Sequence, residues 1–290
     1  MKFFLIFFII LGLFLSTCKT KPITPPEPYA LLEPVLVFDK VEAKAPSVMT
    51  LFFSLEINNP FPFPGSAKIE SWQAELNGKR AVSGFSLENP NAVFSLSAAP
   101  NSYASFPISL HMDIGALSLE GLAPEDDYTV NLLTELSFSY DSVPAERITL
   151  SCLATFPGIQ EPVFSITSIA ILKAELINTR FRVTLRVNNP NPFQVDLSAF
   201  SYELFGNGRL WANGVEKNAF SVPGKTTVEG NMFLLMNFIG MERNLLNQIV
   251  NLVDVNYRFA GDALVDTGLE YLPNFRTDFD LTGYSRVLER

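Results

Sequence analysis

The 290-residue chain has very little of the side-chain chemistry that enzymes and metal proteins depend on. It has one histidine, His111, and two cysteines, Cys18 and Cys152. With a single histidine, a conventional Ser–His–Asp triad or a His-containing metal cluster is therefore not expected. His111 is expected to be an ordinary strand residue, and Cys152 a small core residue. The sequence predicts a protein that is not an enzyme and that needs no metal and no cofactor.

Charge is also scarce, since only 18% of the residues are charged and the formal net charge is −9. No run of lysine or arginine occurs, so a nucleic-acid partner is excluded and electrostatic docking onto anionic lipid is not expected. Hydrophobic residues make up 48% of the chain, with 26 phenylalanines. That composition is typical of folded, sheet-rich domains with real cores, and it excludes intrinsic disorder.

The one long uninterrupted apolar run stands at the N-terminus, from Phe3 to Leu15. It is too short for a confident transmembrane helix of about 20 residues and fits the apolar part of a signal peptide, residues 1–17. The following Leu15-Ser16-Thr17-Cys18 resembles a bacterial lipobox, in a relaxed form typical of spirochaetes. We therefore expect lipid on Cys18, which leaves no pair of cysteines for an internal disulfide. An ordinary secretory signal or a short anchor is the alternative.

Residues 18–32 are rich in proline, which favours an extended tether between the lipid and the folded body. A lipid on Cys18 makes the membrane the first expected partner and the cell envelope the expected location. Lys19 stands where enterobacterial lipoproteins carry an aspartate retention signal. By analogy, the outer membrane is slightly favoured over the inner membrane.

An internal repeat relates residues 51–84 to residues 181–214, and 181 minus 51 gives a constant offset of 130. Each copy has an alternating apolar strand that stops at an Asn-Asn-Pro motif, and each then has an Asn-Gly pair. The motif residues are Asn58, Asn59, Pro60, Pro62 and Phe63 in the first copy, and Asn188, Asn189, Pro190, Asn191, Pro192 and Phe193 in the second. Phe61 stands in the first copy where the second has Asn191. The repeat predicts two tandem domains.

Period-two alternation indicates strands with one face on a core, and proline after Asn-Asn ends them. Turns are expected at Asn77-Gly78 and Asn207-Gly208, because Asn-Gly is the strongest short hairpin signal. Apolar residues three or four apart predict an amphipathic helix over 238–252, with a shorter equivalent around 114–133. Val130 is aligned with Val250, and the closing strands are expected to end at Phe156-Pro157 and Leu272-Pro273.

The predicted fold is mainly β, with two immunoglobulin-like antiparallel β-sandwich domains and one short helix in each. The first domain is expected at residues 33–157 and the second at 160–281. A short join connects them, and residues 282–290 form a C-terminal tail.

Three groups of residues have both a functional and a structural interpretation. Glu125-Asp126-Asp127 could bind calcium, but no Gly-and-carboxylate loop spacing accompanies it, so a solvated loop is favoured. The motif asparagines could contact a ligand, although capping of the turn is favoured. The phenylalanines fit a core better than a binding platform, with Phe52 on the polar face of its strand as the exception.

The ordered set of alternating strand, Asn-Asn-Pro-Asn-Pro-Phe and Asn-Gly resembles the water stress and hypersensitive response domain of the late embryogenesis abundant type 2 family. Residues 178–230 carry the resemblance most fully, and the first copy is more divergent. The resemblance implies folded, non-catalytic modules linked to desiccation and stress responses.

The leading functional hypothesis is a non-enzymatic, lipid-anchored envelope protein with a stress-response or protective binding role, acting on a client protein or a membrane. The alternative is an envelope module that holds an apolar ligand or a partner protein. An enzyme is the least favoured class.

Overall fold

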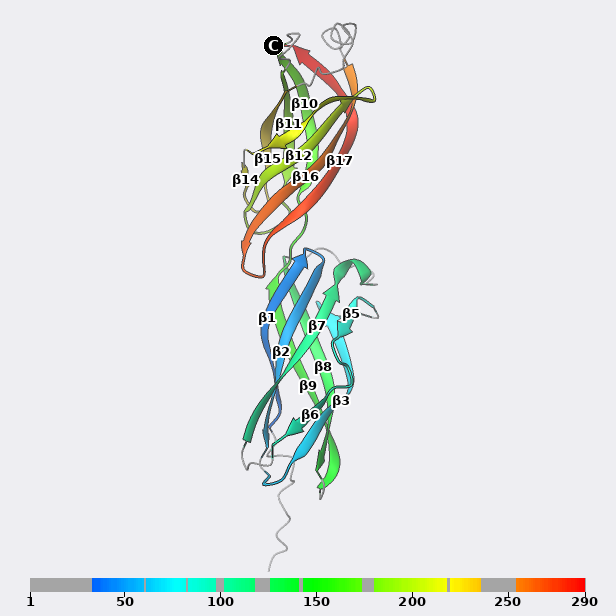
Figure 1. Ribbon diagram of the computed structural model, residues 1–290, viewed down its shortest axis with the longest axis vertical. Coiled ribbons are helices and arrows are strands. Elements are labelled where there is room, and N and C mark those ends of the chain that lie inside the picture. Colours follow the sequence, from blue (N-terminus) through cyan, green and yellow to red (C-terminus); the bar gives the residue numbers. More distant parts are fainter. Residues whose placement is uncertain are drawn as a thin grey trace, which may run out of the picture.

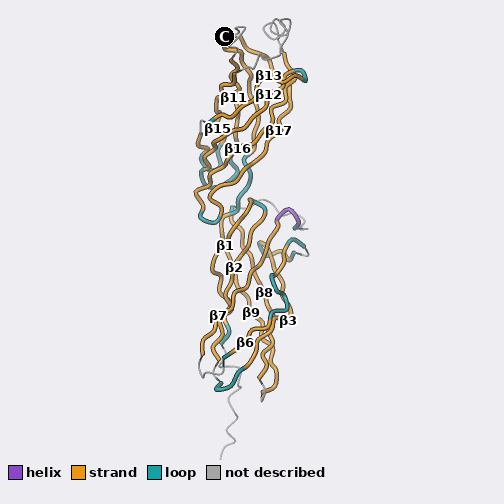
Figure 2. The backbone as a smooth tube through the Cα atoms, in the orientation of Figure 1, coloured by secondary structure: helices purple, strands orange, loops and turns teal. Residues whose placement is uncertain are grey.

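The computed structural model describes residues 33–59, 61–81, 83–97, 102–117, 126–140, 143–173, 180–217, 220–235 and 254–289. These residues are almost entirely strand, arranged in several antiparallel sheets, so the prediction of a mainly β fold is confirmed. The strands form two bodies stacked end to end along the long axis of the molecule (Figures 1 and 2). We call residues 35–157 the first unit and residues 163–289 the second unit. None of the described residues lies in a helix long and apolar enough to cross a bilayer.

The first unit is a sandwich of two sheets. One sheet has the order β1-β2-β7-β5, and the other has β4-β3-β8-β9 with β6 paired to β3. In chain order the strands are β1 (Val35–Ala45), β2 (Val48–Asn59), β3 (Gly65–Leu76), β4 (Lys79–Arg80), β5 (Phe85–Leu87), β6 (Val93–Leu96), β7 (Ser102–Asp113), β8 (Asp127–Tyr140) and β9 (Val143–Pro157).

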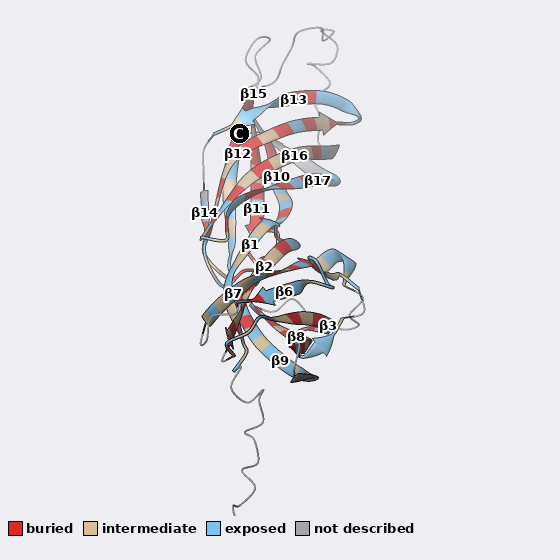
Figure 3. Ribbon diagram, turned by 60° about the horizontal axis from the view of Figure 1, so that its bottom comes forward, coloured by how far each residue is buried: buried red, intermediate tan, exposed pale blue. Residues whose placement is uncertain are grey.

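The core of the first unit lies between these sheets. Leu51, Phe53 and Leu55 of β2 belong to one buried cluster with Leu132 and Leu136 of β8, and all five side chains are fully buried. Buried and half-buried positions alternate along both strands, as Figure 3 shows. The alternation in the sequence therefore reflects one apolar face on the core and one face towards solvent.

The second unit is built on one continuous sheet with the order β13-β12-β16-β17-β10-β11-β15, and β14 pairs with β12. Its core lies between the β10-β11-β15 part of the sheet and the rest. The strands are β10 (Val163–Lys173), β11 (Arg180–Asn188), β12 (Val195–Gly206), β13 (Arg209–Glu216), β14 (Phe220–Val222), β15 (Thr227–Leu235), β16 (Asp254–Leu269) and β17 (Leu272–Glu289).

Three sequence expectations need correction. The helix expected around 114–133 is limited, in the described part, to the 3-10 turn η2 (Ile114–Ala116), and Asp127 already begins β8. Residues 127–133 alternate inward and outward, all of them pair with β9, and residues 130–133 also pair with β3, which a helix could not satisfy. The helix expected over 238–252 lies outside the described residues.

The expected C-terminal tail at 282–290 is instead strand as far as Glu289. Leu272 begins this last strand rather than ending one, and the strand joins β10 in parallel at Ile169↔Val287. Pairing satisfies backbone groups that a free tail would leave to water. This contact joins the two parts of the second sheet, and it is the one parallel pairing among the described strands.

The alignment of Val130 with Val250 is also wrong. Val130 pairs with Leu76, one residue before the Asn77 turn, and the residue paired with Gly206, one before the Asn207 turn, is Tyr257. The counterpart of Val130 by position in the sheet is therefore Tyr257.

Candidate functional site

Asn189 is the centre of the loop that carries the Asn-Asn-Pro motif in the second unit, residues 188–193, which we call the motif loop. Its side chain is fully buried directly after β11, where Pro190 ends the strand. Its Nδ2 donates to the carbonyl oxygens of Phe193 (2.7 Å), Val222 (3.0 Å) and Pro223 (3.3 Å). Its Oδ1 accepts from the backbone N–H of Asn191 at 3.0 Å. One amide therefore satisfies the backbone groups that leave the sheet at this turn.

Asn59 has the matching position in the first unit. Its Nδ2 donates to the carbonyl oxygens of Phe63 (3.2 Å) and Ser97 (2.5 Å), and its Oδ1 accepts from the backbone N–H of Phe61 (3.2 Å). Tyr140 adds a donated hydrogen bond to the same Oδ1 at 3.2 Å. Both amides are used by the protein's own backbone, so neither is left to contact a ligand.

The remaining motif residues surround these two amides. Asn58 is half-buried, Asn188 is exposed and accepts from the Thr227 hydroxyl at 3.2 Å, and the ring of Phe193 packs against the second core. Pro62 and Pro192 are exposed and Pro190 is half-buried, while Pro60 lies outside the described residues.

The one position where the two motifs differ has a separate role in each unit. Phe61 stacks on Phe63 and meets the edge of Tyr140, with ring centroids 5.2 and 4.8 Å apart, closing the end of the first core. Asn191 is buried and binds the join between the units: its Oδ1 accepts from Gln160 N–H (2.7 Å) and its Nδ2 donates to Gln160 C=O (2.9 Å). At this position, the first unit therefore has an aromatic ring that closes the end of its core, whereas the second unit has an amide that binds the linker.

The two Asn-Gly pairs form matching hairpin turns. Asn77 and Asn207 each have φ of 50°, and the glycines that follow have φ of 73° and 77°. This left-handed region is accessible to asparagine and glycine at low cost. Asn77 Oδ1 also accepts from Thr129 N–H (2.7 Å), and Asn207 Oδ1 accepts from Asn256 N–H (3.1 Å). Each turn is thus tied to the next strand of its sheet, and Gly78 and Gly208 complete it.

Tyr271, at the tip of the β16–β17 hairpin, joins the second unit to the first. Its backbone C=O accepts from Ala43 N–H at 2.9 Å, and its hydroxyl donates to Pro157 C=O. Its ring meets the edge of Phe156 with centroids 6.0 Å apart. Burial raises the pKa of the Tyr271 phenol well above its ordinary value, with smaller contributions from Tyr128 and Asp127. Tyr271 packs against the cores of both units.

Two further contacts lie at the junction close to the motif loop, and the first of them joins the two units. Lys225 forms an ion pair with Asp126, one of the acidic residues considered for calcium, and Gly158 N–H donates to Asp126 C=O at 2.7 Å. Asp126 is therefore part of the junction. Within the described residues no group of three or more potential metal ligands occurs.

Gly224 is fixed by the close approach of its backbone to the motif loop. A Cβ at this position would fall inside van der Waals contact of the Pro192 carbonyl. We expect Gly224→Ala to lower the free energy of unfolding by about 1–3 kcal/mol, because the loop or the strand must shift. Chemical denaturation measures this change. Gly115→Ala is the control, since its Cβ would meet only Asp113 Oδ1 at 3.3 Å. Equal effects of both substitutions would contradict the account.

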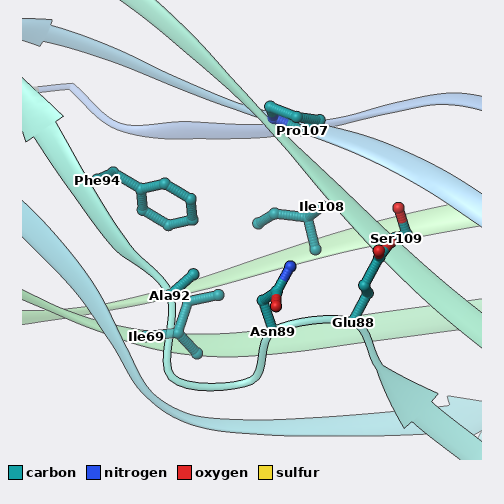
Figure 4. A pocket seen from close by; sticks show the side chains of 8 residues that line it. All are labelled: Ile69, Glu88, Asn89, Ala92, Phe94, Pro107, Ile108 and Ser109. Carbon is teal, nitrogen blue, oxygen red and sulfur yellow. The ribbon is translucent and has the colours of Figure 1, made fainter.

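A side cavity opens in the first unit where the chain crosses from one sheet to the other, between β5 and β6 (Figure 4). Its volume is about 260 Å³. Buried Ile69 and Ile108 line it, together with the ring of Phe94. The remaining lining residues are Ala92 and Pro107, with the polar Glu88, Asn89 and Ser109. Its walls are thus partly apolar and reach residues of the core.

The other candidate residues have structural environments. His111 Nδ1 lies 2.9 Å from the hydroxyl of Thr50 on the neighbouring strand. Burial raises the pKa of the half-buried Cys152 thiol, which makes it a poor nucleophile. Lys40 Nζ lies 5.0 Å from the centroid of the Phe52 ring, so this phenylalanine on the polar face has a cationic partner. Cys18 lies outside the described residues.

Sequence reasoning found the motif residues but missed Tyr271 and the cavity. Tyr271 stands just before Leu272-Pro273, where a closing strand was expected to end, so no sequence signal marked it as a junction residue. The cavity depends on how β5, β6 and β7 pass one another, which local periodicity does not specify. The Phe61/Asn191 difference was visible in the sequence, but its meaning needed the linker contact.

Several solved structures share features of this chain at low similarity. A protein from Archaeoglobus fulgidus has 17% identity and a TM-score of 0.26, with 43% of this chain and 97% of that chain covered. The periplasmic chaperone SfaE has 11% identity and a TM-score of 0.24, with 89% and 100% covered. A calcium binding mutant of Bacteroides uniformis β-glucuronidase 2 has 9% identity and a TM-score of 0.23, with 80% of this chain and 26% of that chain covered. At such low TM-scores none of them carries an inference about function.

No curated protein matches the chain. A family model described as Late embryogenesis abundant protein matches residues 184–272, from the middle of β11 to the start of β17. The matched segment contains the Asn189 loop, the Asn207 turn and Tyr271. The resemblance to the late embryogenesis abundant type 2 family is therefore confirmed, and it is carried by the second unit.

Proposed function

We propose that this protein is a non-enzymatic, lipid-anchored envelope protein whose two units are copies of one stress-associated module. In this proposal it acts in desiccation or stress response by binding or shielding a client. The family match over 184–272 is the observation that carries the proposal. The polar residues of the motif support it further, because Asn59 and Asn189 are fully used in holding backbone.

The arrangement of the units supports a tethered body. Ala43, near the end of β1, contacts Tyr271 of the second unit, so Val35 lies at the far end of that strand. Eleven residues of strand span roughly 35 Å. A tether that enters before Val35 would attach at the end of the rod opposite to the second unit (Figure 1). A lipid on Cys18 would then hold the second unit away from the membrane, with the outer membrane slightly favoured.

A drying assay tests the protective role. A labile enzyme is dried and rehydrated with the purified protein or with an inert lipoprotein at equal mass, and its recovered activity is measured. We expect higher recovery with this protein. Recovery no better than with the inert lipoprotein would remove the protective role.

Metabolic labelling with radioactive palmitate tests the anchor separately. The wild-type protein is expected to take up label and to fractionate with membranes, whereas Cys18→Ala takes up none and is released. Labelling that persists in Cys18→Ala would contradict lipidation at this residue. Because this assay reads only the anchor, its outcome is independent of the drying assay.

The side cavity favours the second candidate function, an envelope module that holds an apolar ligand or a partner protein. Its apolar walls of Ile69, Phe94 and Ile108 are of the kind that bind small apolar groups. Native mass spectrometry of gently purified protein tests this candidate. A co-purifying small molecule or subunit would support it, and bare protein at every condition would count against it.

A further inference from the structure

The outer face of β11 and β15 carries a patch that the motif and the junction do not use. The inner positions of these strands, Phe181, Val183, Met232 and Leu234, are buried in the core. The alternate positions face outwards. In register across the two strands they are Arg186 with Glu229, Thr184 with Asn231, Arg182 with Phe233, and Arg180 with Leu235.

The half of this face nearer the junction is internally satisfied. Arg186 binds Glu229 through Nε (3.1 Å) and Nη2 (2.7 Å), and Thr184 donates to Asn231 Oδ1 at 2.9 Å. The charges and polar groups there have partners within the sheet. Little is left on that half for another molecule to bind.

In the half of this face farther from the junction, the arginines lack anionic partners among the described residues. Neither Arg180 nor Arg182 forms an ion pair within the described part of the chain, and both stand opposite apolar residues. Arg182 is half-buried, and its Nε is buried without any hydrogen-bond partner. A buried N–H that has lost water without gaining an acceptor is unfavourable. This half of the face is therefore complementary to an anion.

Two large apolar side chains lie beside these arginines. Phe233 is 54% exposed and Leu235 is 53% exposed. The motif loop lies next to the start of β15, where Thr227 pairs with Asn188. Phe233 and Leu235 stand at the opposite end of that strand. The eight residue steps from Thr227 to Leu235 span roughly 27 Å, so the patch lies towards the end of the second unit that is remote from the junction.

We propose that Arg180, Arg182, Phe233 and Leu235 form a docking surface for an anionic lipid membrane other than the one that holds the Cys18 lipid, because the patch lies at the end of the second unit remote from the junction. The guanidinium groups bind lipid phosphates, while Phe233 and Leu235 insert into the boundary between headgroups and acyl chains. The absence of a Lys/Arg run excludes docking by charge alone, but here strand pairing places two cations next to two apolar groups. An anionic lipid provides both a phosphate and an apolar layer, which matches this combination.

Vesicle co-sedimentation tests the proposal with a chain of residues 19–290, which has neither the apolar leader nor the lipid. This chain retains the whole folded body, because every residue of both cores lies at Leu36 or later. We expect stronger binding to phosphatidylglycerol vesicles than to phosphatidylcholine vesicles. The double variant Arg180→Gln/Arg182→Gln is expected to bind phosphatidylglycerol about tenfold or more weakly. Phe233→Ser/Leu235→Ser is expected to weaken binding by about the same factor.

Two matched controls identify the patch as the cause. Arg186→Gln removes a cation from the same face of β11, but one already paired with Glu229. Leu153→Ser removes a side chain that is 65% exposed in the first unit. Both variants are expected to bind within about twofold of the wild-type chain, since neither residue belongs to the patch. Thermal unfolding followed by circular dichroism establishes that each variant is folded.

Equal binding to both vesicle types, or no binding to either, would overturn the proposal. A loss of binding in the two control variants as large as in the patch variants would do the same. A soluble poly-glutamate peptide is the last comparison. If it binds the wild-type chain as tightly as the vesicles do, and Phe233→Ser/Leu235→Ser does not matter, the surface serves an acidic protein and the lipid proposal fails.

Discussion

Replacing Asn189 by alanine is expected to lower the free energy of unfolding of the second unit by about 4 kcal/mol. The side chain is fully buried and donates to the carbonyls of Phe193, Val222 and Pro223. It also accepts from the backbone N–H of Asn191. Alanine removes all of these hydrogen bonds together, although the Pro223 carbonyl keeps another one, from the Thr226 hydroxyl at 2.8 Å. Each unsatisfied buried group costs about 1–3 kcal/mol, so the sum is large for one substitution.

The neighbouring asparagine provides the matched control. Asn188 is exposed and accepts one hydrogen bond from the Thr227 hydroxyl at 3.2 Å. Asn188→Ala is expected to change stability by about 0.5 kcal/mol or less. Urea denaturation of both variants measures the difference. If the two substitutions cost the same, the motif amide does not organise the turn, and its role must lie elsewhere.

Replacing Tyr271 by alanine is expected to loosen the contact between the two units. The substitution removes the hydrogen bond to Pro157 C=O and the ring contact with Phe156. It leaves the backbone contact with Ala43 in place. Together the lost contacts are worth about 2–3 kcal/mol of coupling between the units. The wild-type chain is expected to unfold in one transition, and Tyr271→Ala in two.

Differential scanning calorimetry measures the number of transitions, and Tyr271→Phe separates the ring from the hydroxyl. The phenylalanine variant keeps the ring contact and is expected to lose only about 1 kcal/mol. Two transitions in the wild-type chain, or one transition in Tyr271→Ala, would contradict this role of the residue.

The same variant has a pH signature. The pKa of the Tyr271 phenol is raised by burial, so the folded protein holds that proton more tightly than the unfolded chain. The stability from this group is complete below the ordinary tyrosine pKa of about 10 and is lost as pH rises above it. Tyr271→Phe is expected to lose less stability than the wild-type chain between pH 9 and about 11.

The strands were predictable from the sequence because their signal is local. Leu51, Phe53 and Leu55 alternate with polar residues, and a strand with one buried face cannot slip by one residue without exposing them. The Asn77 and Asn207 turns were predictable for a related reason, since Asn-Gly suits the left-handed backbone that such a hairpin requires. The capping roles of Asn59 and Asn189 were predictable because each precedes a proline, which cannot continue the strand and leaves backbone groups for a side chain to bind.

Long-range pairing could not be read from the sequence. Residues 127–133 lack helix-breaking residues, and only their pairing with β3 and β9 shows that they are strand. In the expected tail, residues 282–286 continue the hairpin with β16, and only residues 287–289 pair with β10, which lies more than a hundred residues earlier. The patch at Arg182 and Phe233 was hidden for the same reason, because its two halves come from different strands.

Asn191, through Gln160, and Tyr271, through Ala43 and Pro157, are expected to hold the two units in one fixed orientation. Distance measurement between two spin labels tests this arrangement, with cysteines at the exposed Leu153 in β9 and Val215 in β13 of a Cys152→Ser chain of residues 19–290, which has no other cysteine. A single narrow distance distribution is expected, and it broadens in Tyr271→Ala. A broad distribution without that substitution would show that the units move independently and would contradict the account.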